Sequence, residues 1–152
     1  MSEKKNTEYA FNGYFNIIQN VITRMAQNSF LIKAWSATIF AAIIVLTYSI
    51  INVLIFGVLL LIIVMFWYLD SYYLKLERLY RRLYNLKVEE YNDLSKRENM
   101  VLFDLNYKLF IKEEQKVPRI MVSKSEGLFY IPLIITLAIF FGSSIVLLIN
   151  PI

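Results

Sequence analysis

Two long stretches of the sequence are mainly apolar and contain no Asp, Glu, Lys or Arg. The first runs from Ala34 to Leu69 and the second from Gly127 to Ile152. A helix needs roughly 20 apolar residues to cross about 30 Å of hydrocarbon. The first stretch is long enough for two such helices and the second for one. The pattern therefore predicts an all-α integral membrane protein, a helical hairpin followed by a third transmembrane helix.

We expect a single membrane domain, 1–152, with polar residues at the ends of each membrane span. The predicted spans are 29–50, 53–72 and 127–149. Asn52 is the most polar residue near the middle of the first stretch, so it marks the turn of the hairpin. Lys33 is expected to extend its amino group back to the lipid headgroups. Ser123 and Glu126 have the spacing of a capping box at the start of the third span.

Both segments that flank the hairpin carry a helical stripe of apolar residues at alternating spacings of four and three. The first, in 8–28, consists of Phe11, Phe15, Ile18, Ile22 and Met25. The second, which leads into 73–93, consists of Tyr72, Leu76, Leu79, Leu83 and Leu86. The stripes can pack on each other within one chain, or they can form a coiled coil between subunits. We favour packing within the chain, because two heptads are few for a coiled coil.

The segment 94–122 has weaker patterning and is predicted to be irregular. Between Phe103 and Leu109, apolar and polar residues alternate. This alternation predicts a short strand that lies on a partner or on a membrane surface.

The positive charges are distributed asymmetrically along the chain. All Lys and Arg residues lie in 1–33 or 70–126, and none lies near Asn52 or after Gly127. Under the positive-inside rule, the N-terminus and the segment 70–126 face the cytoplasm, and the C-terminus lies outside. The sequence thus predicts a multi-pass protein of the cytoplasmic membrane.

Composition excludes several kinds of chemistry. The chain has no Cys and no His, which excludes a disulfide, a thiolate nucleophile, a Cys/His metal site and an imidazole base. No phosphate-binding loop, dinucleotide-binding loop or nucleophile elbow is present. We therefore expect no catalytic residue, no metal and no cofactor, and we do not expect an enzyme.

Ionisable groups near the spans are few. The apolar stretches themselves contain none, which argues against a proton relay, a voltage sensor or an ion-coupled transporter. Asp70 is expected to cap a helix or form a pair at the membrane edge. Its nearest candidate partners in the sequence are Lys75, Tyr72 and Tyr73.

A stripe of basic residues follows the second span. Lys75, Arg78 and Arg82 share one helical face, and Arg81 lies beside it. The stripe can hold the anionic headgroups of the bilayer, or it can bind the phosphate of a nucleotide-type signal. We favour the lipid, because juxtamembrane basic clusters commonly serve this purpose. A stable complex with nucleic acid is not expected.

Small residues recur in the first and third spans, at spacings that let two helix backbones approach closely. They are Ala34, Ala37 and Ala41 in the first span and Ala138 and Gly142 in the third. These faces can pack the three spans together, or they can join copies of the chain in a homo-oligomer that surrounds a pore.

Three stretches carry a resemblance to a known group of proteins: RMAQNSFLIKAW (24–35), FWYLDSYYLKLERLYRRLY (66–84) and FYIPL (129–133). They resemble a widespread family of small, uncharacterised three-span membrane proteins of bacteria. The layout is also similar to the two-span effector modules of bacterial conflict systems, which are thought to form pores on a nucleotide signal. The turn near Asn52 is shorter than is usual in the family.

The resemblance and the small-residue faces together predict an oligomeric, channel-like membrane effector that acts in bacterial defence against phage. The alternative is a non-conducting scaffold that recruits a cytoplasmic partner through the segment 70–126.

Overall fold

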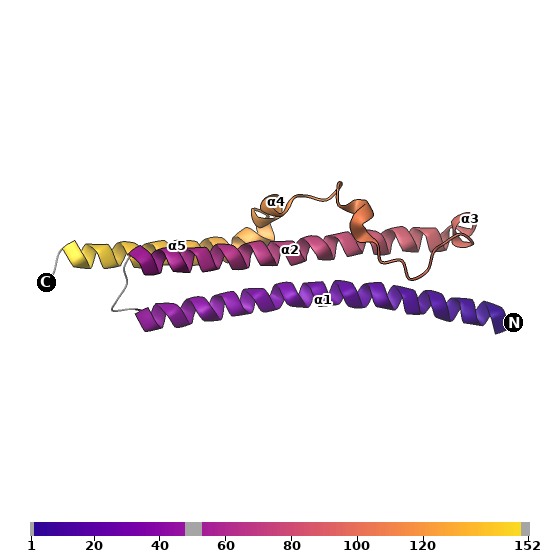
Figure 1. Ribbon diagram of the computed structural model, residues 1–152, viewed down its shortest axis with the longest axis horizontal. Helices are drawn as coiled ribbons and strands as arrows, with labels where there is room; N and C mark the ends of the chain where they lie inside the picture. Colours follow the sequence, from indigo (N-terminus) through magenta and orange to yellow (C-terminus); the bar gives the residue numbers. More distant parts are fainter. Residues whose placement is uncertain (1, 48–52, 150–152) are drawn as a thin grey trace. The chain divides into compact units, whose positions relative to one another are not determined.

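The computed structural model describes residues 2–47 and 53–149, and within these residues it contains helices and no strand. The all-α fold class is confirmed. Figure 1 follows the helices along the chain. They are α1 (Ser2–Thr47), α2 (Val53–Asn92), α3 (Leu94–Arg97), the 3-10 helix η1 (Tyr107–Phe110), α4 (Val117–Met121) and α5 (Lys124–Ile149).

Helices α1, α2 and α5 are long and apolar enough to cross a membrane. Helix α1 is continuous from Ser2 to Thr47, so it contains both the predicted flanking helix and the described part of the first predicted span. Helix α2 likewise joins the second span to the basic segment that follows it. The predicted turn at Asn52 lies outside the described residues.

The chain divides into two compact units, and both α1 and α2 contribute to each of them. Unit 1 comprises 1–27 and 73–115, and unit 2 comprises 28–72 and 116–152.

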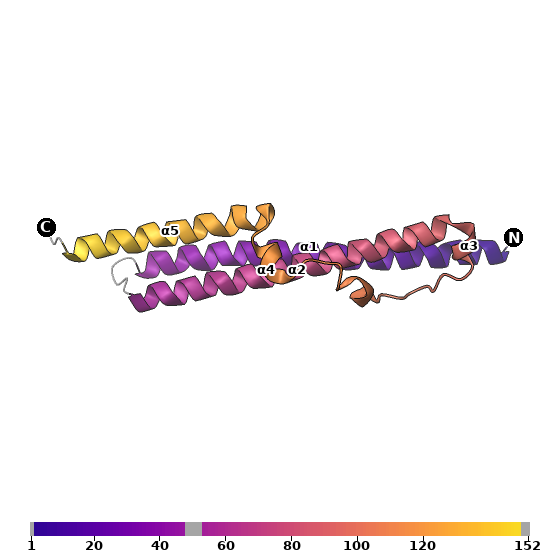
Figure 2. The ribbon, with the colours of Figure 1, turned by 90° about the horizontal axis from the view of Figure 1, so that it is seen from above.

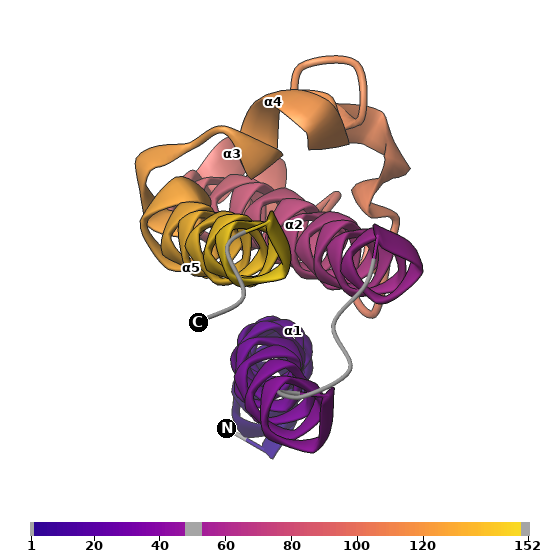
Figure 3. The same ribbon diagram turned by 90° about the vertical axis from the view of Figure 1, so that its left-hand side faces the viewer.

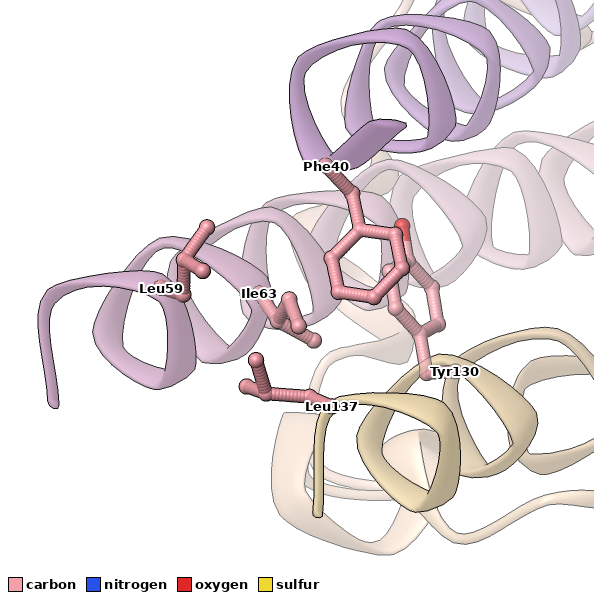
Figure 4. Close-up of a cluster of buried hydrophobic side chains, with 5 residues drawn as sticks. All are labelled: Phe40, Leu59, Ile63, Tyr130 and Leu137. Atoms are coloured by element: carbon pink, nitrogen blue, oxygen red, sulfur yellow. The ribbon is translucent and has the colours of Figure 1, made fainter. Parts of the chain in front are cut away.

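Unit 2 is a three-helix arrangement. The second part of α1 and the first part of α2 run antiparallel, and α5 lies beside both (Figure 2). Viewed end-on, the three helices occupy the corners of a triangle (Figure 3). One buried cluster joins them, with Phe40 from α1, Leu59 and Ile63 from α2, and Tyr130 and Leu137 from α5 (Figure 4). In a lipid environment this close packing contributes through van der Waals contact, because leaving lipid for protein gives little hydrophobic gain.

Unit 1 brings the two apolar stripes together within one chain. Phe11 and Ile18 of α1 are buried, as are Leu79 and Leu83 of α2. Edge-to-face contacts between aromatic rings join Phe11 to Tyr91 and Phe15 to Tyr84, with centroids 4.8 and 5.7 Å apart. These contacts hold the first stripe against α2 within one chain, through Tyr84 and Tyr91, which lie outside the second stripe.

The prediction of a short strand at Phe103–Leu109 was wrong. Phe103 has a φ of 63°, in the left-handed region, and the 3-10 helix η1 begins at Tyr107. The side chain of Asp104 accepts a hydrogen bond from the amide of Asn106 at 3.0 Å, and Asn106 accepts one from Lys108 at 3.2 Å. Such local bonds from Asp and Asn give the backbone an alternative to a strand, and alternation alone does not reveal them.

Candidate functional site: a buried ionic cluster in unit 2

Five polar side chains from the three long helices meet inside unit 2. They are Ser29 and Lys33 of α1, Asp70 of α2, and Glu126 and Tyr130 of α5. On α1 and on α5 the two contributing residues are four apart, so they project from the same helical face. We call this group the ionic cluster.

Asp70 is fully buried and accepts hydrogen bonds on both carboxylate oxygens. The hydroxyl of Ser29 donates to Oδ1 at 2.5 Å, and the hydroxyl of Tyr130 donates to Oδ2 at 3.1 Å. The ammonium of Lys33 pairs with the same Oδ2. Hydrogen bonds to an ionised acceptor are among the strongest in proteins. This environment therefore suits Asp70 as a carboxylate.

Glu126 is buried just as deeply, but it has fewer partners. The ammonium of Lys33 donates to its Oε1 at 3.0 Å. Its Oε2 is buried and has no hydrogen-bond partner among the described residues. Buried polar atoms without a partner are uncommon and costly, so this oxygen distinguishes Glu126 from Asp70.

The predicted capping box at the start of α5 does not form. In a capping box, the carboxylate of Glu126 would accept the amide of Ser123. Instead, the amide of Ser123 donates to the carbonyl of Ile120 at 2.9 Å, at the end of α4. Because α4 already satisfies this amide, the carboxylate of Glu126 is free to bind Lys33.

The ionic cluster holds one ammonium and two carboxyl groups. The side chain of Lys33 is 23% exposed, whereas those of Asp70 and Glu126 are 0% and 1% exposed. Removing an ion from water costs several kcal/mol even after relaxation, and a second carboxylate on the same ammonium adds repulsion. The cluster can thus link three helices, and it offers a carboxyl group for proton exchange.

An aromatic residue of α2 contacts the tyrosine of the cluster. Trp67 stacks on Tyr130, with ring centroids 5.5 Å apart and an interplanar angle of 15°. Its indole N–H donates to the carbonyl of Met121 at 3.0 Å. Tyr130, in turn, is the residue that donates to Asp70. The hydroxyl of Ser71, next to Asp70 in the sequence, is buried and has no partner among the described residues.

The outcome for these residues agrees only in part with expectation. Lys33 was expected to reach the headgroups, but it pairs with Asp70 and Glu126. Asp70 was expected to cap a helix or to form a pair, and it does form a pair, with partners that come from α1 and α5. A proton relay was considered unlikely because the apolar stretches contain no ionisable group, but charged residues at the ends of these stretches meet inside unit 2.

A signal in the sequence does mark the cluster. Lys33 directly precedes the first uncharged stretch, Asp70 directly follows it, and Glu126 directly precedes the second. A hairpin brings its two ends to the same level, and the third helix starts from that level. The three residues therefore lie at the same level when the three spans pack together, and the structure shows that they are in contact.

The predicted basic stripe lies in unit 1, where its arginines pair with acidic residues. Arg82 contacts Glu113 at 3.3 Å and Glu114 at 3.1 Å. Arg78 lies 3.9 Å from Glu114, and Arg81 pairs with Glu77 at 2.8 Å, one turn away on α2. Lys75 is half-buried on the same helix. The arginines thus hold the segment that contains Glu113 and Glu114 against α2, a role that the sequence did not indicate.

The small residues of the predicted packing faces are mostly exposed in the single chain. Ala34 and Ala41 of α1 and Ala138 and Gly142 of α5 are exposed, and Ala37 is partly buried. A Cβ placed on Gly142 would meet no atom within 4 Å. Packing among the three spans therefore uses other residues, and four of these five positions point away from the core of unit 2.

A polar groove of about 410 Å³ lies in unit 1 between α1 and α2. Its lining residues are Gln19, Ile22, Thr23, Arg81, Tyr84 and Asn85. The amide of Gln19 donates to the hydroxyl of Tyr84 at 3.2 Å. Arg81 reaches this groove while paired with Glu77, so the groove presents mostly uncharged polar groups.

Candidate metal sites are absent from the part of the chain that the structure describes, since no three acidic residues gather there. The fold and the site together define an all-α, multi-pass membrane protein with an ionic cluster among its three apolar helices. Comparisons with protein-family models, curated proteins and solved structures found no match to the chain.

Proposed function

We propose that the protein is an oligomeric membrane effector, channel- or pore-like, that perturbs the cytoplasmic membrane in bacterial defence. The observation that carries this proposal is the outward direction of the small-residue faces. Ala34, Ala41, Ala138 and Gly142 are exposed in the single chain. Small residues on an outward face permit close approach of a second helix backbone, so these faces fit a contact between copies of the chain.

The hydroxyl groups in the same helices support an apolar rather than a hydroxyl-lined pore. Thr38 donates to the carbonyl of Ala34, and Thr136 donates to that of Pro132, both at 2.9 Å. Ser143 donates to the carbonyl of Phe140 at 2.8 Å. Each of these hydroxyls donates its proton within its own helix and therefore has no free donor for water in a pore. An apolar constriction can open and close by wetting and dewetting.

The remaining parts of the proposal rest on the sequence. The positive-inside rule supports a cytoplasmic N-terminus, a cytoplasmic segment 70–126 and an external C-terminus. The role in defence rests on the resemblance in layout to the effector modules of conflict systems. A nucleotide-type signal stays a prediction, because Glu113 and Glu114 would have to release Arg78 and Arg82 before these could bind phosphate.

The experiment compares two glycines under the same substitution. Both Gly142 and Gly57 are exposed, and a methyl group added to either would meet no atom within 4 Å. Only Gly142 lies on a predicted small-residue face. We expect Gly142→Leu to shift the detergent-solubilised protein to smaller species and to reduce the loss of membrane potential on induced expression. Gly57→Leu should leave both unchanged. A monomeric wild type, or equal effects of the two variants, would contradict the proposal.

A second candidate function is favoured by one observation in unit 1. Large apolar side chains are exposed in the segment between Leu94 and Ile111, among them Val101, Phe103 and Leu109. Such a surface fits a non-conducting scaffold that recruits a cytoplasmic partner. In the experiment above, a scaffold would leave the membrane potential intact in every variant, including the wild type.

A further inference from the structure

The charge of the ionic cluster is unbalanced if every group in it is ionised. Lys33 supplies one positive charge, whereas Asp70 and Glu126 supply two negative ones. A net negative charge buried among apolar helices is expensive, so ionisable groups at such positions find compensation. The cluster therefore needs one more positive charge than the described side chains provide.

The groups around Glu126 show where that charge fits. The carboxyl group of Glu126 faces Lys33 of α1 and Asp70 of α2. On the same helix as Glu126, Tyr130 binds Asp70. Arg119, the charged residue of α4, is exposed and has no ion pair among the described residues. No second cation thus reaches Glu126 from the described helices packed against it.

The hydrogen bonds indicate that the missing positive charge belongs on Glu126 rather than on Asp70. Asp70 receives donors from Ser29, Lys33 and Tyr130, all of which favour a charged acceptor. Glu126 receives one donor on Oε1, and its buried Oε2 has none among the described residues. A charged oxygen without a donor is the least stable arrangement in the cluster.

The groups around Glu126 suit a metal cation less well than a proton. Hard metal ions require several oxygen ligands arranged around them, and here the ammonium of Lys33 already occupies the space between the two carboxyl groups. A proton needs only the one free oxygen.

We propose that Glu126 is a proton-binding site, with the proton on Oε2 while Lys33 and Asp70 are charged. The bound proton makes the cluster neutral overall. Its release to water forms the Glu126 carboxylate, which leaves one negative charge unbalanced among α1, α2 and α5. This inference stands without the proposed channel function, because it concerns the ionisation of one chain.

The test is an infrared measurement on the purified full-length chain in lipid nanodiscs, recorded as the pH is changed. A protonated carboxyl group has a carbonyl stretching band that a carboxylate lacks. We expect one protonated carboxyl per chain near neutral pH and complete loss of this band in Glu126→Gln. The variant replaces the carboxyl by an amide of nearly the same shape, and its melting temperature reports whether it folds.

Glu114→Gln is the matched control. The side chain of Glu114 is 5% exposed, so it is nearly as buried as Glu126, but two arginines approach it. We expect this variant to keep the band of the wild type. The absence of the band from the wild type near neutral pH would overturn the proposal, whether or not any variant folds.

Two further outcomes would also overturn it. A band that persists unchanged in folded Glu126→Gln would assign the proton to another residue. A band that disappears when sodium replaces a bulky organic cation at constant pH would show that a metal ion displaces the proton, and the site would then not be specific for protons.

Discussion

Lys33 is the residue on which both buried carboxyl groups of unit 2 depend. Its ammonium contacts Asp70 and Glu126, and the described residues offer neither of them another cation. Removing one partner of a buried ion pair leaves an uncompensated charge, which typically costs about 3–5 kcal/mol. Protonation of the second carboxyl group would lower this cost.

We therefore predict that Lys33→Met is strongly destabilising although it preserves most of the side-chain volume. The measurement is the thermal unfolding midpoint of the purified protein in detergent, at several pH values. The midpoint should recover partly at low pH, because protonation removes the negative charge left without a cation. Lys112→Met, at an exposed position, is the control and should have little effect. A Lys33→Met midpoint equal to that of the control would show that the cluster contributes no stability.

At the residue scale, the sequence predicted where the charges are but not which of them meet. Asp70 was recognised as unusual because it borders a span. Its partners Lys33 and Tyr130 are far from it in sequence, and only the packing of three helices brings them together. The Oε2 of Glu126 has no donor partly because the amide of Ser123, which could have donated to the Glu126 carboxylate, donates to a carbonyl of α4 instead.

At the scale of elements, the packing of α1 on α2 in unit 1 has a direct test. Leu83 of α2 is fully buried, whereas Leu94 of α3 is 77% exposed. A buried Leu→Ala substitution typically costs about 2–5 kcal/mol, because it removes contacts and leaves a cavity. An exposed one usually changes stability by less than about 0.5 kcal/mol.

We predict that Leu83→Ala lowers the unfolding midpoint and exposes unit 1 to limited proteolysis, and that Leu94→Ala does neither. Chemical denaturation in detergent micelles, with peptide mapping of the cleavage sites, measures both effects. Should the two variants behave alike, the stripes would not form the core of this unit in solution.

The helices were predictable because each carries a strong periodic or uninterrupted apolar signal. The stripe from Phe11 to Met25 and the stripe from Tyr72 to Leu86 both belong to helices. The segment 94–122 was less predictable, since short elements depend on individual hydrogen bonds. In α3, for example, Asp93 caps the helix by accepting the amide of Ser95 at 3.0 Å. Hydrogen bonds from Ser95 hold the pKa of Asp93 below its usual value.

At the scale of the whole molecule, three membrane-spanning helices would place the two ends of the chain on opposite sides of the bilayer. In the proposed topology, which rests on the charge distribution, the C-terminus is the external end. We predict that a reporter fused after Ile152 is active only if it functions outside the cytoplasm. A reporter inserted after Asn99 should show the opposite behaviour.

Measurement of both reporters in the same cells decides the topology. Cytoplasmic activity after Ile152 would contradict the three-span arrangement, and the insertion after Asn99 would then show which helix fails to cross. The sequence predicted the number of apolar helices, because hydrocarbon thickness sets their length. It did not predict that α1 and α2 each contribute to two compact units, since this division depends on contacts between segments distant in sequence.

The stack of Trp67 on Tyr130 supplies an optical reporter of the cluster. The chain has two tryptophans, and the other, Trp35, is 60% exposed. In Trp35→Phe, the tryptophan fluorescence would come from one indole, whose ring lies against the tyrosine that binds Asp70. Any rearrangement of α5 against α2 would change the polarity and quenching around that indole. Helix movement in unit 2 can thus be followed in real time without attaching a dye.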